Sequence, residues 1–231
     1  MAGVQKKLTR KELLKEPDQF ITFSGRLIAF GQRYRRPLTY AGMSVLALLV
    51  VFTAARYFIA RSENRAFALL DQYAGEYRQA LSAKGAEPAM EAVRQGFETL
   101  IDAYGRRTAG RLARIRYGDI CYAAGRYERA VALYTQALSD FSDEPFYRVL
   151  ILNSLGYAHW QNGDPAQAIT FFQQVAETAD APMKDQALFA LVDLNAGLGK
   201  SDPSRDALRQ LLDGFPDSDY ARVARESFPG A

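Results

Sequence analysis

The sequence predicts an all-α protein in which a single transmembrane helix is followed by an α-solenoid of antiparallel helix pairs. Three observations predict this class: an uncharged apolar run near the N-terminus, apolar residues that recur at steps of three and four along the remainder, and an internal repeat of 38 residues. We expect four parts: a basic tail at 1–37, the membrane helix at 38–60, a helical hairpin at 61–105, and repeats with a C-terminal capping helix at 106–231.

The tail holds the excess of positive charge. It contains nine lysines and arginines against three acidic residues, whereas the net charge of the whole chain is +3. Part of it has apolar residues at steps of 3, 4, 3 and 4, the spacing of one face of a helix. Two interpretations stay open: this juxtamembrane helix lies on an anionic membrane surface, or it packs on another membrane subunit. The stripe consists of Phe20, Phe23, Leu27, Phe30 and Tyr34.

The apolar run is long enough to cross a membrane. Leu38 to Ala55 gives 18 residues without a charge, and a hydrocarbon core of ~30 Å requires about this length at ~1.5 Å per residue. We expect the span to extend to Ala60. A cleaved signal peptide is the competing interpretation, because Thr53 to Ala55 are small residues, but the preceding region is too long for one. The basic side favours a cytoplasmic N-terminus, with the C-terminal domain outside.

Two apolar stripes predict the hairpin that follows. The first helix should continue from the span without a break until Gly85, since no proline lies between Pro37 and Pro88. The second helix should run from about Ala89 to Tyr104 and cover the first. Alternatively, the first stripe pairs with a second copy of the chain. The stripes are Phe67, Leu70, Ala74, Tyr77 and Leu81, then Met90, Val93, Phe97, Leu100 and Tyr104.

The repeat carries the strongest signal. "YGDICYAAGRYERAVALYTQAL" begins at Tyr117 and "LGYAHWQNGDPAQAITFFQQVA" at Leu155, each with Gly in its second place. A small residue in the first helix allows close approach, the next Gly permits the turn, and an Ala and an aromatic residue pack from the second helix. The matched positions are Gly118 and Gly156, Gly125 and Gly163, Ala130 and Ala168, and Tyr134 and Phe172.

A weaker third unit and a final helix complete the predicted stack. The third unit has Val192 in place of the small residue, and we expect Ser201 to Arg205 to lengthen its turn. Residues Asp219 to Phe228 should form a helix that caps the last apolar face.

This pattern resembles the tetratricopeptide repeat. Together with the apolar segment at Leu38 to Ala60, it resembles the YfgM-like family, single-pass proteins of the bacterial inner membrane with periplasmic repeats that are ancillary subunits of the Sec translocon. The resemblance implies a non-enzymatic interaction scaffold near the translocon that engages periplasmic chaperones or emerging chains. A structural or adaptor subunit of another cell-envelope complex, for division or secretion, is the alternative interpretation.

The repeat register places six side chains toward the concave side of the stack. Aromatic side chains with polar tips suit the binding of proteins or peptides. The alternative for Tyr157 and Trp160 is that they pack between repeats. The six predicted partner-binding residues are Asp119, Tyr122, Asn153, Tyr157, Trp160 and Gln161.

We expect no catalytic, cofactor or metal site, and neither a nucleic acid nor a small-molecule substrate as partner. Gly197 to Ser201 imitates the end of a phosphate-binding loop, but a helix should precede it and the required first Gly is missing. His159 is the only histidine and Cys121 the only cysteine, so both are expected to pack. The acidic turn with Asp140, Asp143 and Glu144 is expected to be solvated.

Overall fold

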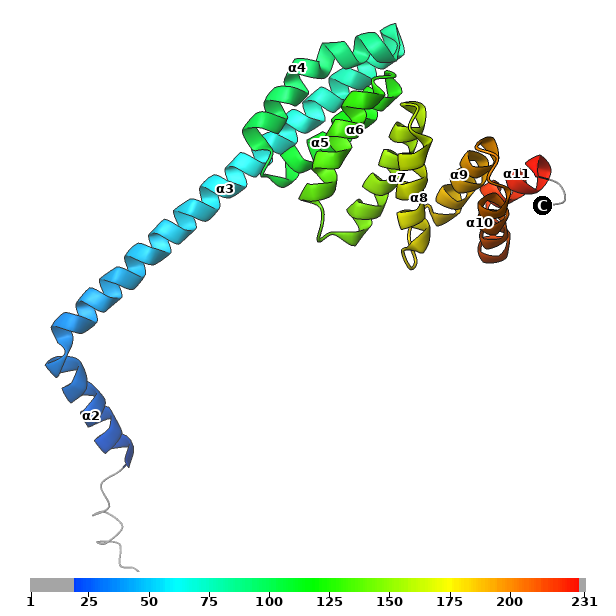
Figure 1. Ribbon diagram of the computed structural model, residues 1–231. Helices are drawn as coiled ribbons and strands as arrows, with labels where there is room; N and C mark the ends of the chain where they lie inside the picture. Colours follow the sequence, from blue (N-terminus) through cyan, green and yellow to red (C-terminus); the bar gives the residue numbers. More distant parts are fainter. Residues whose placement is uncertain (1–18, 229–231) are drawn as a thin grey trace, which may run out of the picture. The chain divides into compact units, whose positions relative to one another are not determined.

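The structure is a computed structural model that describes residues 19–228, and the side chains of these residues except 19–24 and 27. Every element in the described part of the chain is a helix, which confirms the all-α class (Figure 1). The expected features of residues 1–18, and the side chains of Phe20, Phe23 and Leu27, lie outside the described residues. The contacts divide the chain into two units, Met1–Ala60 and Arg61–Ala231.

The first unit contains α2 (Gln19–Arg33) and the beginning of α3 (Arg35–Lys84). Tyr34 separates the two helices although the backbone hydrogen bonds continue, from Tyr34 N to Phe30 O at 2.9 Å and from Leu38 N to Tyr34 O at 2.9 Å. Pro37 explains the interruption, because its ring has no N–H to donate to the carbonyl of Arg33 and crowds it. The chain therefore bends at Tyr34 (Figure 1).

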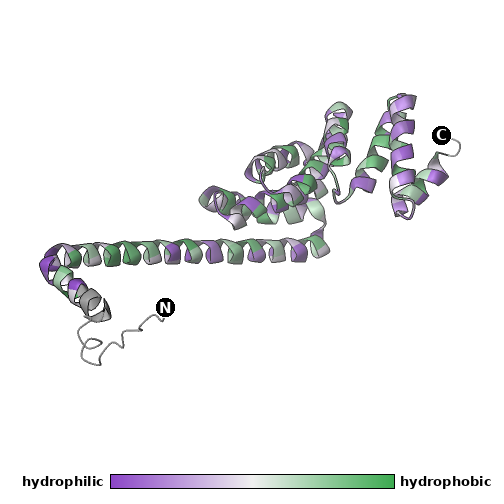
Figure 2. Cartoon of the chain, turned by 90° about the horizontal axis from the view of Figure 1, so that it is seen from below, coloured by the Kyte–Doolittle hydropathy of each residue, from purple (hydrophilic) through white to green (hydrophobic). Residues whose placement is uncertain are grey.

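The apolar part of α3 meets the length and composition of a membrane span. Its best 18-residue window has a mean hydropathy of 2.0, and none of that window is buried. Hydroxyl groups within it bond to the helix itself: Ser44 Oγ donates to Tyr40 O at 2.9 Å, and Thr53 Oγ1 to Leu49 O at 2.9 Å. Figure 2 shows that this stretch is mainly hydrophobic. Because its side chains are exposed, a role as the core helix of a soluble domain does not fit.

The second half of α3 pairs with α4 (Ala86–Tyr104), as the stripes predicted. The helix ends at Lys84 and the chain turns at Gly85, whose φ of 84° suits glycine. Gly96 of α4 allows the ring of Tyr73 to lie directly on the backbone, and the rings of Tyr73 and Phe97 are 5.9 Å apart. The predicted face of α4 is buried through Met90, Val93, Phe97 and Leu100.

The predicted face of α3 is only partly correct. Phe67 and Leu81 remain 36% and 39% exposed, whereas Ala66 is fully buried and Tyr77 is 6% exposed. The helix is turned so that its neighbouring row of side chains meets α4 and the next helix pair. That row comprises Ala66, Leu69, Leu70, Tyr73, Tyr77 and Ala80. The spacing defined the period of the stripe, but two adjacent rows share this period and only packing selects between them.

Six of the seven remaining helices in the described chain form three consecutive antiparallel pairs that stack along the second unit, and the last helix packs on the third pair (Figure 1). One side of α7 contributes to the first apolar core and the other side to the second, so no helix pair covers its own apolar surface. The helices are α5 (Thr108–Ala123), α6 (Tyr127–Asp140), α7 (Pro145–Gln161), α8 (Pro165–Glu177), α9 (Lys184–Gly197), α10 (Ser201–Gly214) and α11 (Asp219–Ser227).

Two glycines of the repeat hold aromatic rings against the backbone. A Cβ on Gly118 would lie 2.6 Å from the ring of Tyr134, and one on Gly156 would lie 2.7 Å from the ring of Phe172. Both rings are almost completely buried. The contact explains why Gly and an aromatic residue recur together in the two units, and it places each ring on the first helix of its own pair.

The third unit differs from the prediction at its turn. Ser201 to Arg205 do not lengthen the turn but form the first part of α10. Counted from the turn glycine Gly199, Ser204 takes the place of Ala130, and its hydroxyl donates to Val192 O at 3.0 Å. Val192 fills the space left by glycine in the earlier units, and the partner ring is replaced by the smaller Leu208. A larger residue on the first helix is thus accompanied by a smaller one on the second, so the two changes partly compensate.

The helix α11 is present as predicted, and the residue before it, Ser218, attaches it to α9. Ser218 Oγ accepts a hydrogen bond from Tyr220 N at 3.1 Å, which caps the helix. The same hydroxyl donates to Asp185 Oδ2 of α9 at 2.5 Å.

Two of the three acidic residues after α6 are paired, which corrects the expectation that the whole turn is solvated, whereas Asp143 is exposed as expected. Arg111 of α5 donates to Glu144 Oε1 at 2.7 Å and lies 4.1 Å from the ring centroid of Phe141. Arg114 pairs with Asp140 and donates to Gly105 O at 2.9 Å. Two arginines on one face of α5 therefore bind the end of α6 and the turn that follows it, and one of them also binds the loop between α4 and α5.

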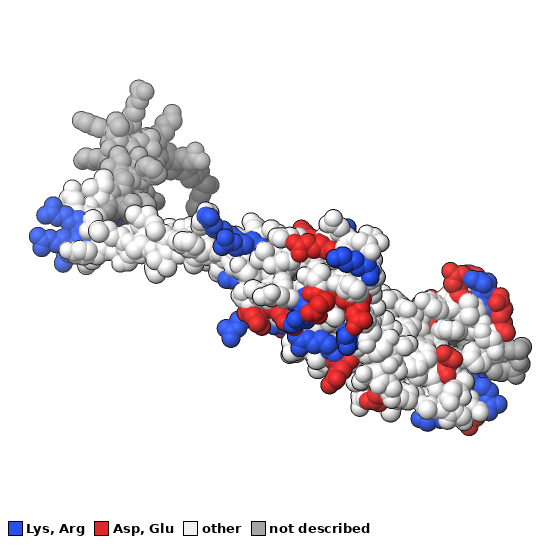
Figure 3. Space-filling view, turned by 90° about the horizontal axis from the view of Figure 1, so that it is seen from above, with Lys and Arg blue, Asp and Glu red and all other residues white. Residues whose placement is uncertain are grey.

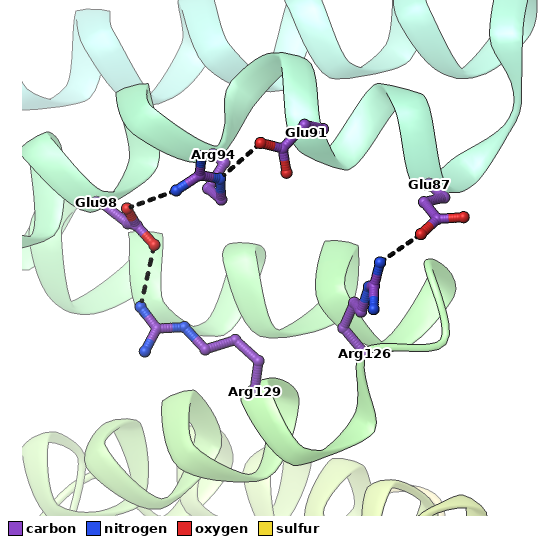
Figure 4. A network of polar contacts seen from close by, with 6 residues as sticks. All are labelled: Glu87, Glu91, Arg94, Glu98, Arg126 and Arg129. Carbon is purple, nitrogen blue, oxygen red and sulfur yellow. Dashed lines mark hydrogen bonds and ion pairs between the residues drawn. The ribbon is translucent and has the colours of Figure 1, made fainter.

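A second set of ion pairs joins α4 to α6 on the surface (Figure 4). Arg129 lies 3.3 Å from Glu98, which also faces Arg94 at 3.7 Å, and Arg126 pairs with Glu87. All these side chains are more than one third exposed, so solvent weakens each pair. They orient the two helices more than they stabilise them.

Candidate protein-interaction surface

A groove of about 430 Å³ lies between α3, α5 and α7 in the second unit. Apolar side chains from all three helices line it, and two carboxylates and two guanidinium groups stand among them. The lining residues are Leu70, Asp71, Ala74, Arg78, Leu112, Ile115, Arg116, Asp119, Tyr147 and Leu150. Such a surface suits a polypeptide segment, since apolar side chains can be buried while charged groups orient it.

The helical period explains how the groove is assembled. Leu112, Ile115 and Asp119 of α5 follow one another at steps of three and four, so they share one face. Leu70 and Ala74 of α3 are also one turn apart. The sequence predicted only Asp119 of this set. The stripe of α3 was assigned to packing against α4, whereas Leu70 and Ala74 of that stripe line the groove beside α5.

Asp119 is the most constrained charged group of the groove. Tyr134 donates its hydroxyl proton to Asp119 Oδ1 at 2.8 Å. Burial raises the pKa of Asp119, and the Tyr134 hydrogen bond and the nearby Arg116 only partly oppose this. Burial also raises the pKa of Tyr134, so its hydroxyl stays protonated and remains a donor. The carboxylate is therefore fixed at the edge of an apolar surface.

We expect Asp119 to make stability dependent on pH. Because its pKa is raised by folding, its contribution is fully present below the pKa of the unfolded chain, ~3.9, and is lost as the pH rises through the folded value. Asp119→Asn keeps an acceptor for Tyr134 without the charge, so this decline should disappear. Urea unfolding of both proteins between about pH 4 and 7 checks the prediction, and an unchanged pH dependence in the variant would contradict it.

The other predicted partner-binding residues lie beyond this groove. Tyr122 is half-buried with its ring edge-on to Tyr127 at 5.4 Å. Asn153 is only 6% exposed, and its amide nitrogen lies 3.5 Å from Gln186 Oε1 of α9. A partner that reached Asn153 would have to displace Gln186.

Tyr157 and Trp160 both pack and remain partly accessible. Their rings are 6.2 Å apart and nearly parallel, and Tyr157 meets the ring of Phe172 edge-on at 4.9 Å. Burial raises the pKa of Tyr157 to about 12. Gln161, the last residue of α7, is exposed. The structure brings Tyr157 and Trp160 together on α7 but separates them from Asp119.

The residues that the sequence analysis considered for catalysis or phosphate binding have packing or connecting positions in the structure. Cys121 is buried, and burial raises the pKa of its thiol to about 11, which disfavours the reactive thiolate. His159 stacks on Phe171 with 5.2 Å between ring centroids. Gly197 to Ser201 joins α9 to α10, so a helix precedes it as expected. Within residues 19–228 there is no group of three or more metal-ligating side chains.

Comparisons with known proteins agree with this architecture. Two tetratricopeptide repeat models match residues 108–181 and 153–219. TPR-like repeats of a Podosopora anserina protein have 14% identity and a TM-score of 0.55, over 71% of this chain and 83% of that one. A tetratricopeptide repeat protein from Parabacteroides merdae has 15% identity and a TM-score of 0.54, over 68% and 58%. No curated protein matches the sequence.

The matched region coincides with α5 to α10, in which the small, turn and aromatic positions recur. At such low identities the solved structures establish the fold alone. Residues 108–219 therefore carry tetratricopeptide repeats, and proteins with such repeats generally act as non-enzymatic scaffolds for interactions between proteins.

Proposed function

We propose that this protein is a membrane-anchored scaffold that binds segments of other proteins in the groove between α3, α5 and α7. One observation carries the proposal: α3 contains both an exposed apolar stretch of membrane length and a wall of the groove. Tetratricopeptide repeats support the interaction role, and the exposed stretch supports the anchor. Leu38 to Ala60 would cross the lipid, with the tail in the cytoplasm and the repeats in the bacterial periplasm.

Charges placed in the middle of the apolar stretch should release the protein from the membrane. Arginine near the centre of a span costs about 2.5–3.5 kcal/mol per residue on insertion scales. We expect the wild-type protein to stay in the membrane pellet after alkaline carbonate extraction, and Leu46→Arg/Leu49→Arg to be released. Leu198→Arg, at a position 44% exposed in the repeats, is the control and should stay in the pellet. Release of the wild type would contradict the anchor.

Labelling of single cysteines in intact cells tests the orientation. In a Cys121→Ser background, Lys11→Cys should be protected from an impermeant thiol reagent, whereas Asp217→Cys, at an exposed position, should react. The opposite result would place the repeats in the cytoplasm and remove the periplasmic part of the proposal.

Photo-crosslinking from the groove tests the binding role. A photoreactive residue at Ile115, in the groove, should capture a protein partner, whereas one at exposed Val223 of α11 should not. Equal capture from both positions, or none from Ile115, would contradict a groove-specific site. The test compares the amount of crosslinked protein from the two positions, so it does not require the partner to be identified.

The resemblance to YfgM-like proteins supports a place beside the Sec translocon, where the groove would engage periplasmic chaperones or emerging chains. A structural or adaptor role in another envelope complex uses the same groove and anchor. Purification in mild detergent distinguishes the two, because recovery with envelope proteins but without any translocon component would remove the Sec assignment.

A further inference from the structure

One face of α2 combines arginines with aromatic rings. Arg26, Phe30 and Arg33 are separated by four and three residues, so they lie on the same side of the helix. Tyr34 follows in the bend, with its ring centroid 4.7 Å from that of Phe30. Phe30 and Tyr34 are 56% and 43% exposed, and both arginines are exposed. No part of the described chain covers this face.

The charge around this face has a single sign. Arg26, Arg33, Arg35 and Arg36 fall within eleven residues, and the sequence contains no acidic residue from Gln19 to Ser62. Among the described residues, no carboxylate pairs with these four arginines. In Figure 3 basic side chains gather at one end of the uncharged stretch of α3. A binding partner that complements these four arginines must therefore carry several negative charges.

The bend at Tyr34 allows α2 to leave the direction of α3. Pro37 removes one hydrogen bond from the helix, and the chain turns within a single residue between α2 and α3. If α3 spans a bilayer from Leu38, Arg33, Arg35 and Arg36 lie within two helical turns of its first apolar residue, and Arg26 lies between three and four turns away. A helix that turns there reaches the headgroups of the same leaflet, and no other partner is required to bring an anion close.

We propose that α2 lies in the headgroup layer and binds anionic phospholipids, with the guanidinium groups on lipid phosphates and the rings of Phe30 and Tyr34 below them. Arginine binds phosphate through two parallel hydrogen bonds, and aromatic rings favour the interface. An in-plane amphipathic helix is stabilised by both contributions. This inference rests on the proposed anchor, because it requires the headgroups to be held beside Tyr34.

Lipid selectivity tests the charge contribution. Each arginine near an anionic surface contributes about a fivefold preference. We expect the full-length protein in detergent to retain phosphatidylglycerol over phosphatidylcholine in native mass spectrometry, and Arg26→Gln/Arg33→Gln to lower that preference by about 25-fold. Arg222→Gln/Arg225→Gln removes two exposed arginines from α11 and should leave it unchanged. Equal preference in all three proteins would overturn the inference.

Depth measurements test the position of the helix. In a Trp160→Phe background, Phe30→Trp carries the only tryptophan of the full-length protein. In vesicles of phosphatidylcholine and phosphatidylglycerol, we expect lipids brominated near the headgroup to quench its fluorescence more than lipids brominated near the chain ends. Adding Pro37→Ala should straighten the helix and abolish the quenching while the protein still floats with the vesicles.

The failures of the two proposals are distinguishable. If the protein floats with the vesicles but the tryptophan is not quenched, α2 does not lie in the headgroups; the anchor stands and the face serves a protein partner instead. If the protein does not float with the vesicles, the anchor fails and the inference fails with it.

Discussion

Gly156→Ala is expected to destabilise the repeats by about 1–3 kcal/mol, although alanine is the better helix former. The added Cβ would lie 2.7 Å from the ring of Phe172, which is fully buried and has no space to retreat. For a folded region of this size, each kcal/mol lowers the melting temperature by roughly 2–4 °C. Circular dichroism of the detergent-solubilised protein during heating measures the change.

Gly75→Ala is the matched control for this prediction. Gly75 also lies within a helix, but an added Cβ there would meet nothing within 4 Å. This substitution should leave the melting temperature unchanged or raise it, since alanine is preferred to glycine by about 0.8–1 kcal/mol in a helix. If both variants lose the same stability, close packing at Gly156 is not the cause.

The third unit suggests how the loss at Gly156 can be reversed. There, Val192 and Leu208 replace the glycine and the aromatic residue together. We therefore expect Gly156→Ala/Phe172→Leu to be less destabilised than the sum of its two single changes, because leucine vacates the space that the methyl group needs. An additive result in this double-mutant cycle would show that the two sites act independently.

Arg114→Gln is expected to cost about 1.5–3 kcal/mol, the usual value for hydrogen bonds to charged groups. Arg114 is 16% exposed, and it pairs with Asp140 after α6 while donating to Gly105 O before α5. Its loss leaves Asp140, which is only 26% exposed, without its arginine partner and frees two connections at once. The urea midpoint of unfolding measures the effect.

Arg94→Gln provides the comparison, because Arg94 also contacts two acidic groups, Glu91 and Glu98. Its side chain is 50% exposed, so water replaces the lost contacts. We expect the urea midpoint of this variant to stay within error of the wild type. A loss equal to that of Arg114→Gln would mean that burial does not decide the strength of these pairs.

The local features of the fold were readable from the sequence because they depend on neighbours along the chain. The two stripes predicted the helices of the hairpin, the 38-residue repeat predicted the paired helices, and Gly125 and Gly163 predicted the turns, where their φ angles are 72° and 83°. The turn of the third unit was assigned wrongly, since Ser204 was not recognised as the small residue in the place of Ala130.

The candidate site was harder to predict from the sequence, because it consists of residues from three helices. Asp119 was selected from the repeat register, but Leu70 of α3 and Tyr147 of α7 belong to the same groove. Nothing in the spacing of α3 indicated which of its two apolar rows faces α4. The choice depends on how α4 and α5 pack at the same time, which is a property of the assembled stack.

The sequence by itself determined that this chain is helical, contains an apolar stretch of membrane length, and repeats a paired-helix unit, because these properties follow from hydrophobic period and from glycine positions. The tertiary structure decided which face of α3 is buried, that Asp140 and Glu144 are held by arginines of α5, and where the groove lies. These depend on contacts between residues distant in the chain, and only packing brings such residues together.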